Sequence, residues 1–551
     1  MELVVCIPTA GTGSRLGELT RNLNKSLLSV DNKPILSHII EKYPKDTNFV
    51  IPIGFASDLV KQYIAMAHPN ANVTFVEVDP FEGEGSGLGY SLLKCRDYLN
   101  KPFIFHSCDT IVLESIPNIK NNWVGLSKIQ PTHEFRRVRV NEQAVIEFID
   151  KDSEITAEQF TYIGLAGVND YQSFWESMRS GGLEAVNLGE VYGLIALIDK
   201  SITTFNFTWF DIGSRSGLEN ARNNIQSTFT PNVLDKEDEA IWFIGDRVIK
   251  FSTDSSFIKN RVQRAQALAD YVPEITFAAQ NMYSYTKVEG QVLSSVVNQT
   301  VFQNFLTYLE GFFDQPIKST LSTKEFNAKC YEFYHDKTLE RVEQYLTRFN
   351  LTDGAVYVNG RKIRPILNQL ENLDWESISN GVPSNFHGDL HFENILVQPN
   401  ESFKFLDWRQ NFAGRLELGD RYYDLAKLLH GMIVPHQSVH DEQYSISLEG
   451  QNTTIDIRIP REYDLIRRSY WEWLTINNYN VQKVYSHTAL VFLNIAALHH
   501  EPYCHFLYHL GRYMLDKGID ENFDGTLPNA QLNASRYIKL KNFRRLHNAS
   551  N

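Results

Sequence analysis

The stretch HGDLHFENILV (387–397), followed closely by FLDWR (405–409), decides the fold of the second half of this chain. Its two apolar runs, 395–397 and 403–406, are short and are separated by a Pro-Asn turn, which predicts two strands of a hairpin. A polar loop enters the first strand, and an aspartate follows the second. The hairpin should therefore bring the loop and the end of the second strand together.

Three polar residues of this segment suit phosphoryl transfer. That reaction needs a carboxylate to orient the attacking hydroxyl and take its proton, and oxygen ligands for a magnesium ion that neutralises the phosphates. Asp389 fits the first role, and Asn394 with Asp407 fits the second. The alternative is a polar loop that only caps two strands.

The segment resembles the HGDLHxxNIL and D-[WF]-x signatures of the aminoglycoside phosphotransferase and choline kinase family, and GD (419–420) and YDLA (423–426) follow as in that family. The resemblance implies an α+β, two-lobed, protein-kinase-like domain over residues 241–551 that uses ATP and Mg²⁺. Its small lobe would cover about 241–300 and its large lobe about 301–551.

A candidate nucleotide-binding lysine lies near the start of this half. The apolar runs 241–244 and 247–251 flank Gly245-Asp246 and predict a hairpin. Lys250 takes the place where kinase-like small lobes carry the lysine that binds the α- and β-phosphates. The helix expected at about 256–271 has no acid before Asp270 to pair with it, so a solvated strand lysine is the alternative.

The first half opens with an apolar strand (3–8) and a glycine-rich loop (9–16). Gly11 and Gly13 allow close backbone approach to a phosphate, and Arg15 adds a positive charge. The loop matches neither the dinucleotide fingerprint, because Leu16 replaces the third glycine, nor a P-loop.

The run from this loop through NKSLL (24–28) to NKPIL (32–36) resembles the opening of the sugar nucleotidyltransferases, with Thr9 and Asn24 as departures. The resemblance implies a Rossmann-like α/β domain over 1–228. Lys25 would contact the α-phosphate and the incoming phosphate. Asp109 and Asp211, the latter in WFDIG (209–213), would bind a second Mg²⁺. Because an open α/β sheet gathers ligands at the carboxyl ends of its strands, the two aspartates should meet there.

The same resemblance assigns further positions, each of which could instead be ordinary turn chemistry. Gly85 and Gly87 fall where relatives contact the nucleobase, and Lys151 falls near the phosphates. Gly164 and Glu190 fall where relatives hold the acceptor.

Composition limits the remaining possibilities. The chain has 551 residues, a formal charge of −13 and five scattered cysteines. We expect a cytoplasmic protein with small-molecule substrates, without nucleic acid or membrane as partner, and with a possible homo-oligomeric state. Residues 229–240 are charged and lack apolar periodicity, which predicts a linker.

The combined hypothesis is a bifunctional enzyme. A kinase would phosphorylate a small hydroxylated metabolite, such as a sugar, and a nucleotidyltransferase would transfer NMP from CTP, UTP, GTP or dTTP, giving an NDP-sugar or NDP-alcohol for surface glycans. One alternative is choline or another amino alcohol as the acceptor, because YWEW (470–473) places aromatic side chains beside an acid. The favoured interpretation of that segment is two aromatics packed in the large lobe. The other alternative is a lone kinase with a non-catalytic N-terminal domain.

Overall fold

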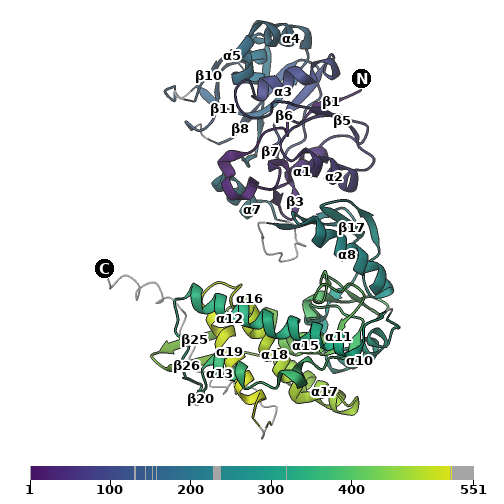
Figure 1. Cartoon of the computed structure of the whole chain (residues 1–551). Helices are drawn as coiled ribbons and strands as arrows, with labels where there is room; N and C mark the ends of the chain where they lie inside the picture. Colours follow the sequence, from purple (N-terminus) through teal and green to yellow (C-terminus); the bar gives the residue numbers. More distant parts are fainter. Residues whose placement is uncertain are drawn as a thin grey trace. The chain divides into compact units, whose positions relative to one another are not determined.

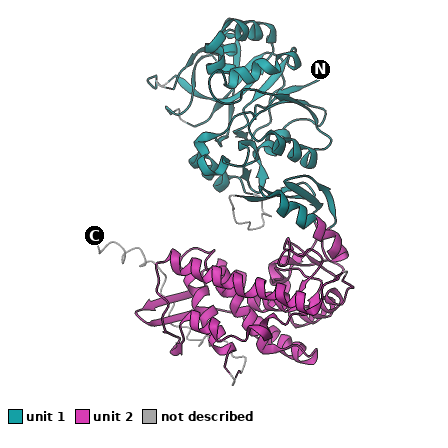
Figure 2. Cartoon of the chain, viewed as in Figure 1, with its two compact units in different colours: residues 1–262, 274–287 teal, residues 263–273, 288–551 magenta. Residues whose placement is uncertain are grey.

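The computed structural model describes residues 2–129, 132–142, 144–151, 153–156, 158–226, 238–317, 319–520 and 523. The chain divides into two compact units (Figure 2), unit 1 with residues 1–262 and 274–287 and unit 2 with 263–273 and 288–551. Most of the predicted linker, 229–237, lies outside the described residues. The predicted domain limits therefore stay predictions.

Unit 1 is built on a nine-stranded mixed sheet in the order β5-β4-β1-β6-β11-β8-β12-β10-β9 (Figure 1). Its strands are β1 (Val4–Cys6), β4 (Asn48–Ile53), β5 (Asn72–Glu77), β6 (Phe103–His106), β8 (Asn122–Ser127), β9 (Arg137–Asn141), β10 (Ala144–Ile149), β11 (Gln159–Val168) and β12 (Ile202–Phe207). The helices of the unit's N-terminal part are α1 (Ile35–Ile40), α2 (Ser57–Ala67), α3 (Leu88–Cys95), α4 (Tyr171–Ser180), α5 (Gly182–Leu188), α6 (Glu190–Ile195) and α7 (Arg215–Asn224).

The central strand β1 shows why the sheet is covered on both faces. Val5 belongs to one hydrophobic cluster, whereas its neighbours Val4 and Cys6 belong to another. Successive side chains of a strand point to opposite faces, so each cluster lies on one side of the sheet. β1 pairs in parallel with β4 and β6, and β4 pairs in parallel with β5. The predicted α/β organisation of this region is confirmed.

A separate two-stranded ribbon brings the two predicted aspartates together, with Asp211 at the end of one strand and Asp109 directly before the other. β7 (Thr110–Val112) pairs antiparallel with β13 (Trp209–Asp211), with Asp211 opposite Thr110. The Ile212 amide donates to the Asp109 carbonyl over 2.8 Å. Backbone pairing thus brings together two residues that lie a hundred positions apart in the sequence.

Unit 1 also contains a four-stranded sheet, β14-β15-β17-β16, that shares its hydrophobic core with α1 and α2. Its strands are β14 (Glu239–Ile244), β15 (Arg247–Ser252), β16 (Ile275–Ala278) and β17 (Met282–Thr286). The Trp242 ring contacts the Tyr63 ring of α2, with 5.1 Å between centroids, and its indole N–H donates to Ser29 Oγ over 2.9 Å. The hairpin predicted over 241–251 is confirmed, and it packs on the N-terminal part of the chain.

Trp242 is fully buried, so Trp242→Ala should strongly destabilise unit 1. Removing a buried tryptophan typically costs about 3–5 kcal/mol. Hydrogen exchange should show reduced protection both in β14–β17 and in α2, because the two share one core. Phe277→Ala, at a position 43% exposed on β16, is the matched control. Loss of protection confined to β14–β17 would contradict the shared core.

Unit 2 is mainly helical, with three small sheets. The last residues of α8 (Ser255–Leu268) belong to unit 2. The α-helices that follow are α9 (Leu293–Val296), α10 (Gln299–Phe313), α11 (Thr323–Tyr331), α12 (Lys337–Arg348), α13 (Ile366–Glu371), α14 (Trp375–Ser379), α15 (Arg421–Ile433), α16 (His436–His440), α17 (Arg461–Ile476), α18 (Val481–Ala496) and α19 (Tyr503–Gly518). Its strands are β18 (Gln291–Val292), β19 (Val356–Val358), β20 (Arg361–Ile363), β21 (Pro383–Ser384), β22 (Ile395–Val397), β23 (Phe403–Phe405), β24 (Gly419–Asp420), β25 (Tyr444–Glu449) and β26 (Asn452–Ile457).

The predicted hairpin of the catalytic segment is present as β22 and β23, which pair antiparallel with Ile395 opposite Phe405. Aromatic side chains of α10 pack beneath it; the Phe305 and Phe312 rings lie 6.3 and 5.1 Å from the Phe405 ring. This packing reflects the three- and four-residue apolar spacing of α10. The hairpin is therefore supported from the hydrophobic core of the unit.

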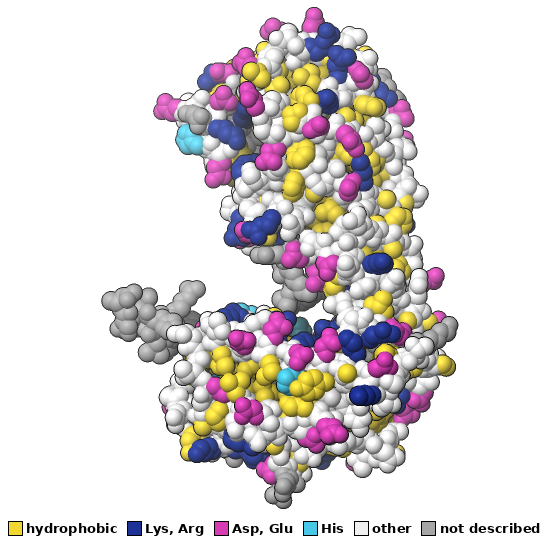
Figure 3. Space-filling model, in the orientation of Figure 1, with side chains coloured by type: hydrophobic (Ala, Val, Ile, Leu, Met, Phe, Trp, Pro, Cys, Tyr) yellow, Lys and Arg dark blue, Asp and Glu magenta, His cyan; other side chains and the backbone are white. Residues whose placement is uncertain are grey.

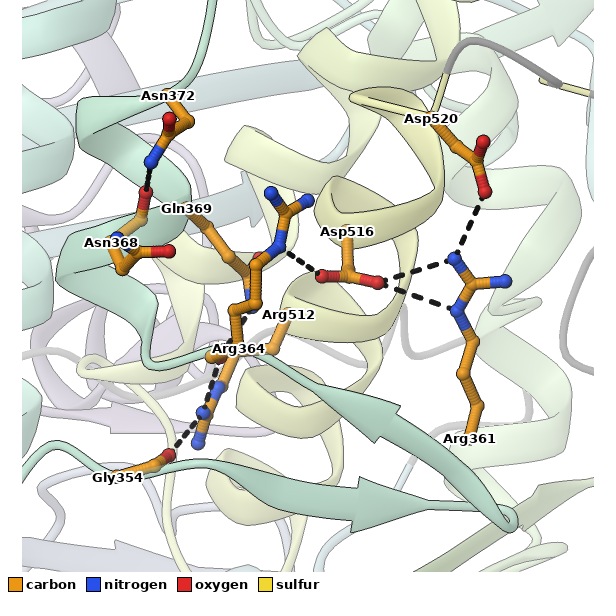
Figure 4. A network of polar contacts seen from close by, with 9 residues as sticks. All are labelled: Gly354, Arg361, Arg364, Asn368, Gln369, Asn372, Arg512, Asp516 and Asp520. Atoms are coloured by element: carbon orange, nitrogen blue, oxygen red, sulfur yellow. Dashed lines mark hydrogen bonds and ion pairs between the residues drawn. The ribbon is translucent and has the colours of Figure 1, made fainter.

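A polar network ties the β19–β20 hairpin and α13 to α19 (Figure 4). The buried Asp516 accepts from Arg361 Nη2 over 3.2 Å and from Arg364 Nε over 2.9 Å. Arg512 donates to the carbonyls of Gly354 and Arg364. Arg512 Nε and Gln369 Oε1 are buried without a hydrogen-bond partner, but the ion pairs of Asp516 and the two bonds of Arg512 join the β19–β20 hairpin to α19.

The surface drawn in Figure 3 carries charges of both signs, and its basic and acidic side chains are interspersed. Among the described residues, no helix has the length and apolar character needed to cross a bilayer. All five cysteines are free thiols.

Candidate active sites

The glycine-rich loop of unit 1 lines a cleft of about 540 Å³. Gly11, Gly13, Arg15, Lys25, Gly87 and Asp109 all contribute to its wall. Gly13 has a φ of +67°, and an added Cβ would lie 3.1 Å from the Lys25 Cβ, so glycine is required there for both conformation and space. Six of the predicted unit 1 residues thus line one cleft.

The charged groups of this cleft converge at its base. Lys25 forms an ion pair with Asp109, and the Ser107 hydroxyl donates to Asp109 over 2.5 Å. A Cβ built on Gly213 would lie 2.9 Å from Asp211 Oδ1, 3.2 Å from Asp109 Oδ2 and 3.2 Å from Arg15 Nη2. Arg15, Lys25, Asp109 and Asp211 therefore meet around Gly213, as expected from the sequence.

The two carboxylates have opposite electrostatic environments. Burial alone would raise the pKa of Asp109, but the charge and hydrogen bond of Lys25 lower it to about 2. Burial and the negative charge of Asp109 raise the pKa of Asp211 to about 6. This repulsion between adjacent carboxylates is what a divalent cation would relieve, and Mg²⁺ is commonly held by one or two carboxylates plus substrate phosphates. The pair fits the predicted metal.

Asn24, which stands where relatives carry proline, has a structural explanation. Its side chain donates to the carbonyls of Thr9 and Phe55 over 2.9 and 2.7 Å and accepts from the Ser26 amide over 3.0 Å. These bonds fix the start of the 3₁₀ turn Lys25–Leu27. The departure therefore preserves the position of Lys25.

The remaining predicted residues of unit 1 lie at different distances from this centre. Lys151 is exposed and is not among the residues that line the cleft; partial burial and the charges of Arg15 and Arg136 lower its pKa. Gly164 has a φ of +70° and lies against Ser107, the residue that supports Asp109. Gly87 lines the cleft, whereas Gly85, with a φ of +83° and open space around it, does not line it and fits a turn.

Glu190 is buried at the start of α6, and burial raises its pKa to about 7, in part against the nearby Arg136. The unfolded value is about 4.3, so the folded state holds this proton more tightly. Its contribution to stability is fully present below pH ~4 and is lost as pH rises through 7. Sequence reasoning missed Arg136, since a single arginine just before a strand gives no signal.

Glu190→Gln should therefore change the pH dependence of stability. Between pH 5 and pH 8 the melting temperature of the wild type should fall more than that of the variant, and above pH 7 the variant should be the more stable protein. Differential scanning calorimetry at several pH values would measure this. The exposed Glu184→Gln on α5 is the control. Parallel pH profiles of wild type and Glu190→Gln would contradict the raised pKa.

The catalytic loop of unit 2 is held by buried partners. Asp424 accepts from the backbone amides of His387 and Gly388 over 2.6 and 2.7 Å, and burial raises its pKa to about 7. His387 is itself buried and bonds to the Leu406 carbonyl over 2.8 Å. Gly388 has a φ of +88°. These contacts orient the loop that carries Asp389.

Asp389 lies between two cations. Lys427 of α15 contacts it over 2.7 Å, and His391 Nε2 lies 3.5 Å away. Burial would raise the pKa of Asp389, but the charges of Lys427 and His391 lower it well below its usual range. The same pairing raises the pKa of His391 to about 9 against the effect of burial. Asp389 is therefore an ionised carboxylate at neutral pH.

Asn394 and Asp407 are adjacent, as predicted. The Leu406 amide donates to the Asn394 carbonyl over 2.8 Å, which places Asp407, with a φ of +58°, beside Asn394. The Asn394 side chain donates to the Asp389 carbonyl over 2.9 Å. An amide oxygen and a carboxylate next to Asp389 are suitable ligands for Mg²⁺.

Lys250 is in β15, where it pairs with Tyr283 in the neighbouring strand. It is buried, with 8% of its surface exposed, so the alternative of a solvated strand lysine is wrong. The helix that follows, α8, carries the buried Arg261 and Arg264. Nucleotide binding by Lys250 stays a prediction.

The aromatic residues of YWEW pack rather than form an open cage. The Trp473 indole donates to Glu310 over 2.7 Å, and its ring stacks on Tyr470 at 6.0 Å. Tyr470 is fully buried and donates to the Leu425 carbonyl. This arrangement supports the packing interpretation of the segment.

Comparison with known proteins agrees with both halves of this description. Residues 331–450 match the model of a family described as "Phosphotransferase enzyme family". The N-terminal region is 25% identical over 253 residues to the bifunctional protein GlmU of Methanococcus vannielii, covering 44% of this chain and 59% of the relative. It is also 27% identical over 104 residues to the UTP–glucose-1-phosphate uridylyltransferase AglF of Haloferax volcanii, covering 18% and 41%.

Among solved structures, the CTP:phosphocholine cytidylyltransferase LicC of Streptococcus pneumoniae matches 41% of this chain and 99% of its own, with 16% identity and a TM-score of 0.34. A UDP-glucose pyrophosphorylase from Acinetobacter matches 41% and 93%, with 13% identity and a TM-score of 0.34. The chain spans less than two thirds of the length of the curated relatives that it matches. Both resemblances are confirmed: the chain joins a region similar to sugar-phosphate nucleotidyltransferases to a segment that matches the phosphotransferase family.

Proposed function

We propose that the chain is a bifunctional cytoplasmic enzyme that phosphorylates a small hydroxylated metabolite with ATP and then transfers a nucleoside monophosphate onto the new phosphate. The observation that carries this proposal is that two groups of charged side chains occur in one chain. Arg15, Lys25, Asp109 and Asp211 converge in unit 1, and Asp389 and Lys427 are in contact in unit 2.

In the kinase reaction, the Asp389 carboxylate would orient the acceptor hydroxyl and take its proton. The hydroxyl oxygen then bonds to the γ-phosphorus, the bond from that phosphorus to the β-γ bridging oxygen breaks, and ADP leaves. Its low pKa keeps Asp389 ionised and able to accept the hydrogen bond. Lys427, 2.7 Å from Asp389, places a positive charge where the phosphoryl group would pass.

In the nucleotidyl transfer, a phosphate oxygen of the phosphorylated metabolite would attack the α-phosphorus of a nucleoside triphosphate, and pyrophosphate would leave. The nucleoside triphosphate and the phosphorylated metabolite are both anions, and their phosphates must approach each other. Arg15, Lys25 and the amides of the glycine loop would bind these phosphates and offset their repulsion. Mg²⁺ held by Asp109 and Asp211, and by Asn394 and Asp407 in the kinase, would supply charge neutralisation of the phosphates. A non-catalytic N-terminal domain would have little use for four converging charged groups.

The two reactions should follow a fixed order. The kinase loop presents carboxylates to a neutral hydroxyl, whereas unit 1 presents cations to a phosphate. The monophosphate should therefore appear before the NDP-linked product, and omission of ATP should abolish both. The product would be an NDP-sugar or NDP-alcohol, consistent with use in surface glycan synthesis.

A matrix of sugars, hydroxy acids and amino alcohols against CTP, UTP, GTP and dTTP, each with ATP, tests this proposal. Mass spectrometry of timed samples would follow both products. Formation of an NDP-linked product from the unphosphorylated metabolite without ATP would overturn the order. If every pair of metabolite and nucleoside triphosphate released ADP but no pyrophosphate, the chain would be a kinase without nucleotidyltransferase activity.

A further inference from the structure

Four cations of unit 2 lie close together, and we call them the basic cluster: Lys337, Arg341, Arg409 and Lys427. Asp389 contacts Lys427 and lies close enough to Lys337 to act on its charge. Lys337 and Arg341 lie one turn apart on α12, Lys427 lies on α15, and Arg409 follows β23. A π-helical turn, Glu332–Asp336, joins α11 to α12 just before Lys337. Such turns often occur at functional sites.

An aromatic platform holds the cluster together. The Lys337 Nζ lies 4.8 Å from the centroid of the Phe333 ring, and the Arg409 guanidinium lies 5.0 Å from the same centroid. The Tyr423 ring, one turn before Lys427 on α15, packs 5.0 Å from Phe333 and 5.9 Å from the Lys337 Nζ. The side chains of α12, α15 and the segment after β23 therefore converge beside the loop of Asp389.

Arg409 is in close contact with that loop. Its amide donates to the His387 carbonyl over 2.8 Å, and a Cβ added to Gly388 would lie 2.5 Å from the Arg409 Cβ. Glycine before Asp389 is thus what allows the arginine to approach the base. This positions a guanidinium next to the site of phosphoryl transfer.

The cluster carries more positive than negative charge. Asp389 pairs with Lys427, but within the described part of the chain Lys337, Arg341 and Arg409 form no ion pair with a carboxylate. The Nε atoms of Arg341 and Arg409 are buried without a hydrogen-bond acceptor. Burial, followed by the charges of Arg409, Lys427 and Arg341, holds the pKa of Lys337 well below its usual range. All three side chains are partly buried, and Arg341 Nη1 donates to Gln344 Oε1 over 2.7 Å. Partly buried cations without a carboxylate partner are stabilised when an anion binds them.

Phosphoryl transfer alone does not explain this excess. Lys427 already supplies one positive charge at Asp389, and among the described residues no acidic side chain forms an ion pair with the other three cations. Arginine suits carboxylate and phosphate because its donors form a planar fork. Three surplus cations beside the catalytic carboxylate have the chemistry of a site for an anionic group on the molecule that is phosphorylated.

We propose that the basic cluster binds a carboxylate or phosphate group of the kinase acceptor, so that the acceptor is an anionic hydroxylated metabolite rather than a neutral sugar or a cationic amino alcohol. This inference rests on the proposed kinase function and names the substrate class of that site. A quaternary ammonium group would be repelled by the same four cations.

Binding to the full-length protein tests the site without turnover. Isothermal titration with D-glucuronate, D-glucose and inorganic phosphate, each with and without Mg-ADP, should show binding of at least one anion and at least tenfold weaker binding of glucose. Lys337→Met and Arg341→Met should each weaken anion binding by tenfold or more, whereas Lys337→Arg should restore most of it. Lys324→Met, at an exposed lysine of α11, should have no effect.

Three outcomes would overturn the inference: neither anion binds the wild type, Lys337→Met binds anions as well as the wild type, or Mg-ADP abolishes the anion binding, which would assign the cluster to the nucleotide. Circular dichroism spectra and melting curves identify a variant that fails to fold, and Lys337→Arg then tests the role of the positive charge in a folded protein.

Kinase assays test the acceptor class and the kinase activity separately. Faster phosphorylation of glucose or choline than of any hydroxy acid would contradict an anionic acceptor but would support the kinase activity. Anion binding together with no ATP turnover for any metabolite of the matrix would contradict the kinase activity but would support the anion site.

Discussion

Asp389→Asn should lower kinase turnover by about 10²–10⁴-fold, the usual contribution of a positioned general base. Asparagine keeps the size of the side chain but cannot take the proton of the acceptor hydroxyl. It also removes the negative charge that contacts Lys427 and His391. ADP release with an accepted metabolite, followed by a coupled assay, measures the effect.

The control for this variant lies in the other half of the same chain. Nucleotidyl transfer from a supplied phosphorylated metabolite should continue at the wild-type rate, because the cleft of unit 1 contains none of the residues around Asp389. Asp441→Asn, at an exposed aspartate of unit 2, should leave both activities unchanged. If Asp389→Asn stopped pyrophosphate release as well, a model of two independent sites would be wrong.

The kinase loop could be predicted from the sequence because its parts are local. Asp389, Asn394 and Asp407 lie within twenty positions, and a single hairpin sets their relation. Two short apolar runs and the turn between them are sufficient to define that hairpin. The burial of His387 and the support from Asp424 follow from the same short segment and its neighbouring helix.

The basic cluster could not be predicted in the same way. Lys337 and Lys427 lie ninety positions apart on two helices, and a lysine on an amphipathic helix usually belongs to its solvated face. Only tertiary packing around Phe333 turns them toward Asp389. The π-helical turn just before Lys337 also shifts the α-helical register of the residues that follow it, and no residue pattern in the sequence predicts that turn.

The first half shows a different limit. Resemblance indicated that Asp109 and Asp211 belong to one site, but the direct pairing of β7 with β13 rests on strands of only three residues each. Periodicity cannot identify strands so short. Likewise, the apolar residues of β14 and β15 predict a hairpin but not the core it joins, because the apolar pattern does not show which residues Trp242 packs against.

Asp109→Asn should reduce nucleotidyl transfer by about 10²–10³-fold, the range seen when one preorganised electrostatic group is removed. The variant loses an anionic oxygen for a hard cation and leaves Asp211 as the remaining carboxylate of the pair. Phosphorylated metabolite should then accumulate, because the kinase reaction continues while pyrophosphate release stops. Asp97→Asn, an exposed residue of the same unit, is the control.

The ion pair with Lys25 makes this prediction sharper. Lys25 is bound to Asp109 in the structure, so it must exchange that carboxylate for a phosphate when substrates enter. Asp109→Asn removes the competitor and leaves a free ammonium facing the glycine loop. Metal-free binding of the nucleoside triphosphate should therefore be retained or tightened while turnover collapses, which titration and rapid-quench measurements resolve. Parallel loss of binding and turnover would mean that Asp109 only holds the fold of the cleft, and normal turnover would place the transfer reaction elsewhere.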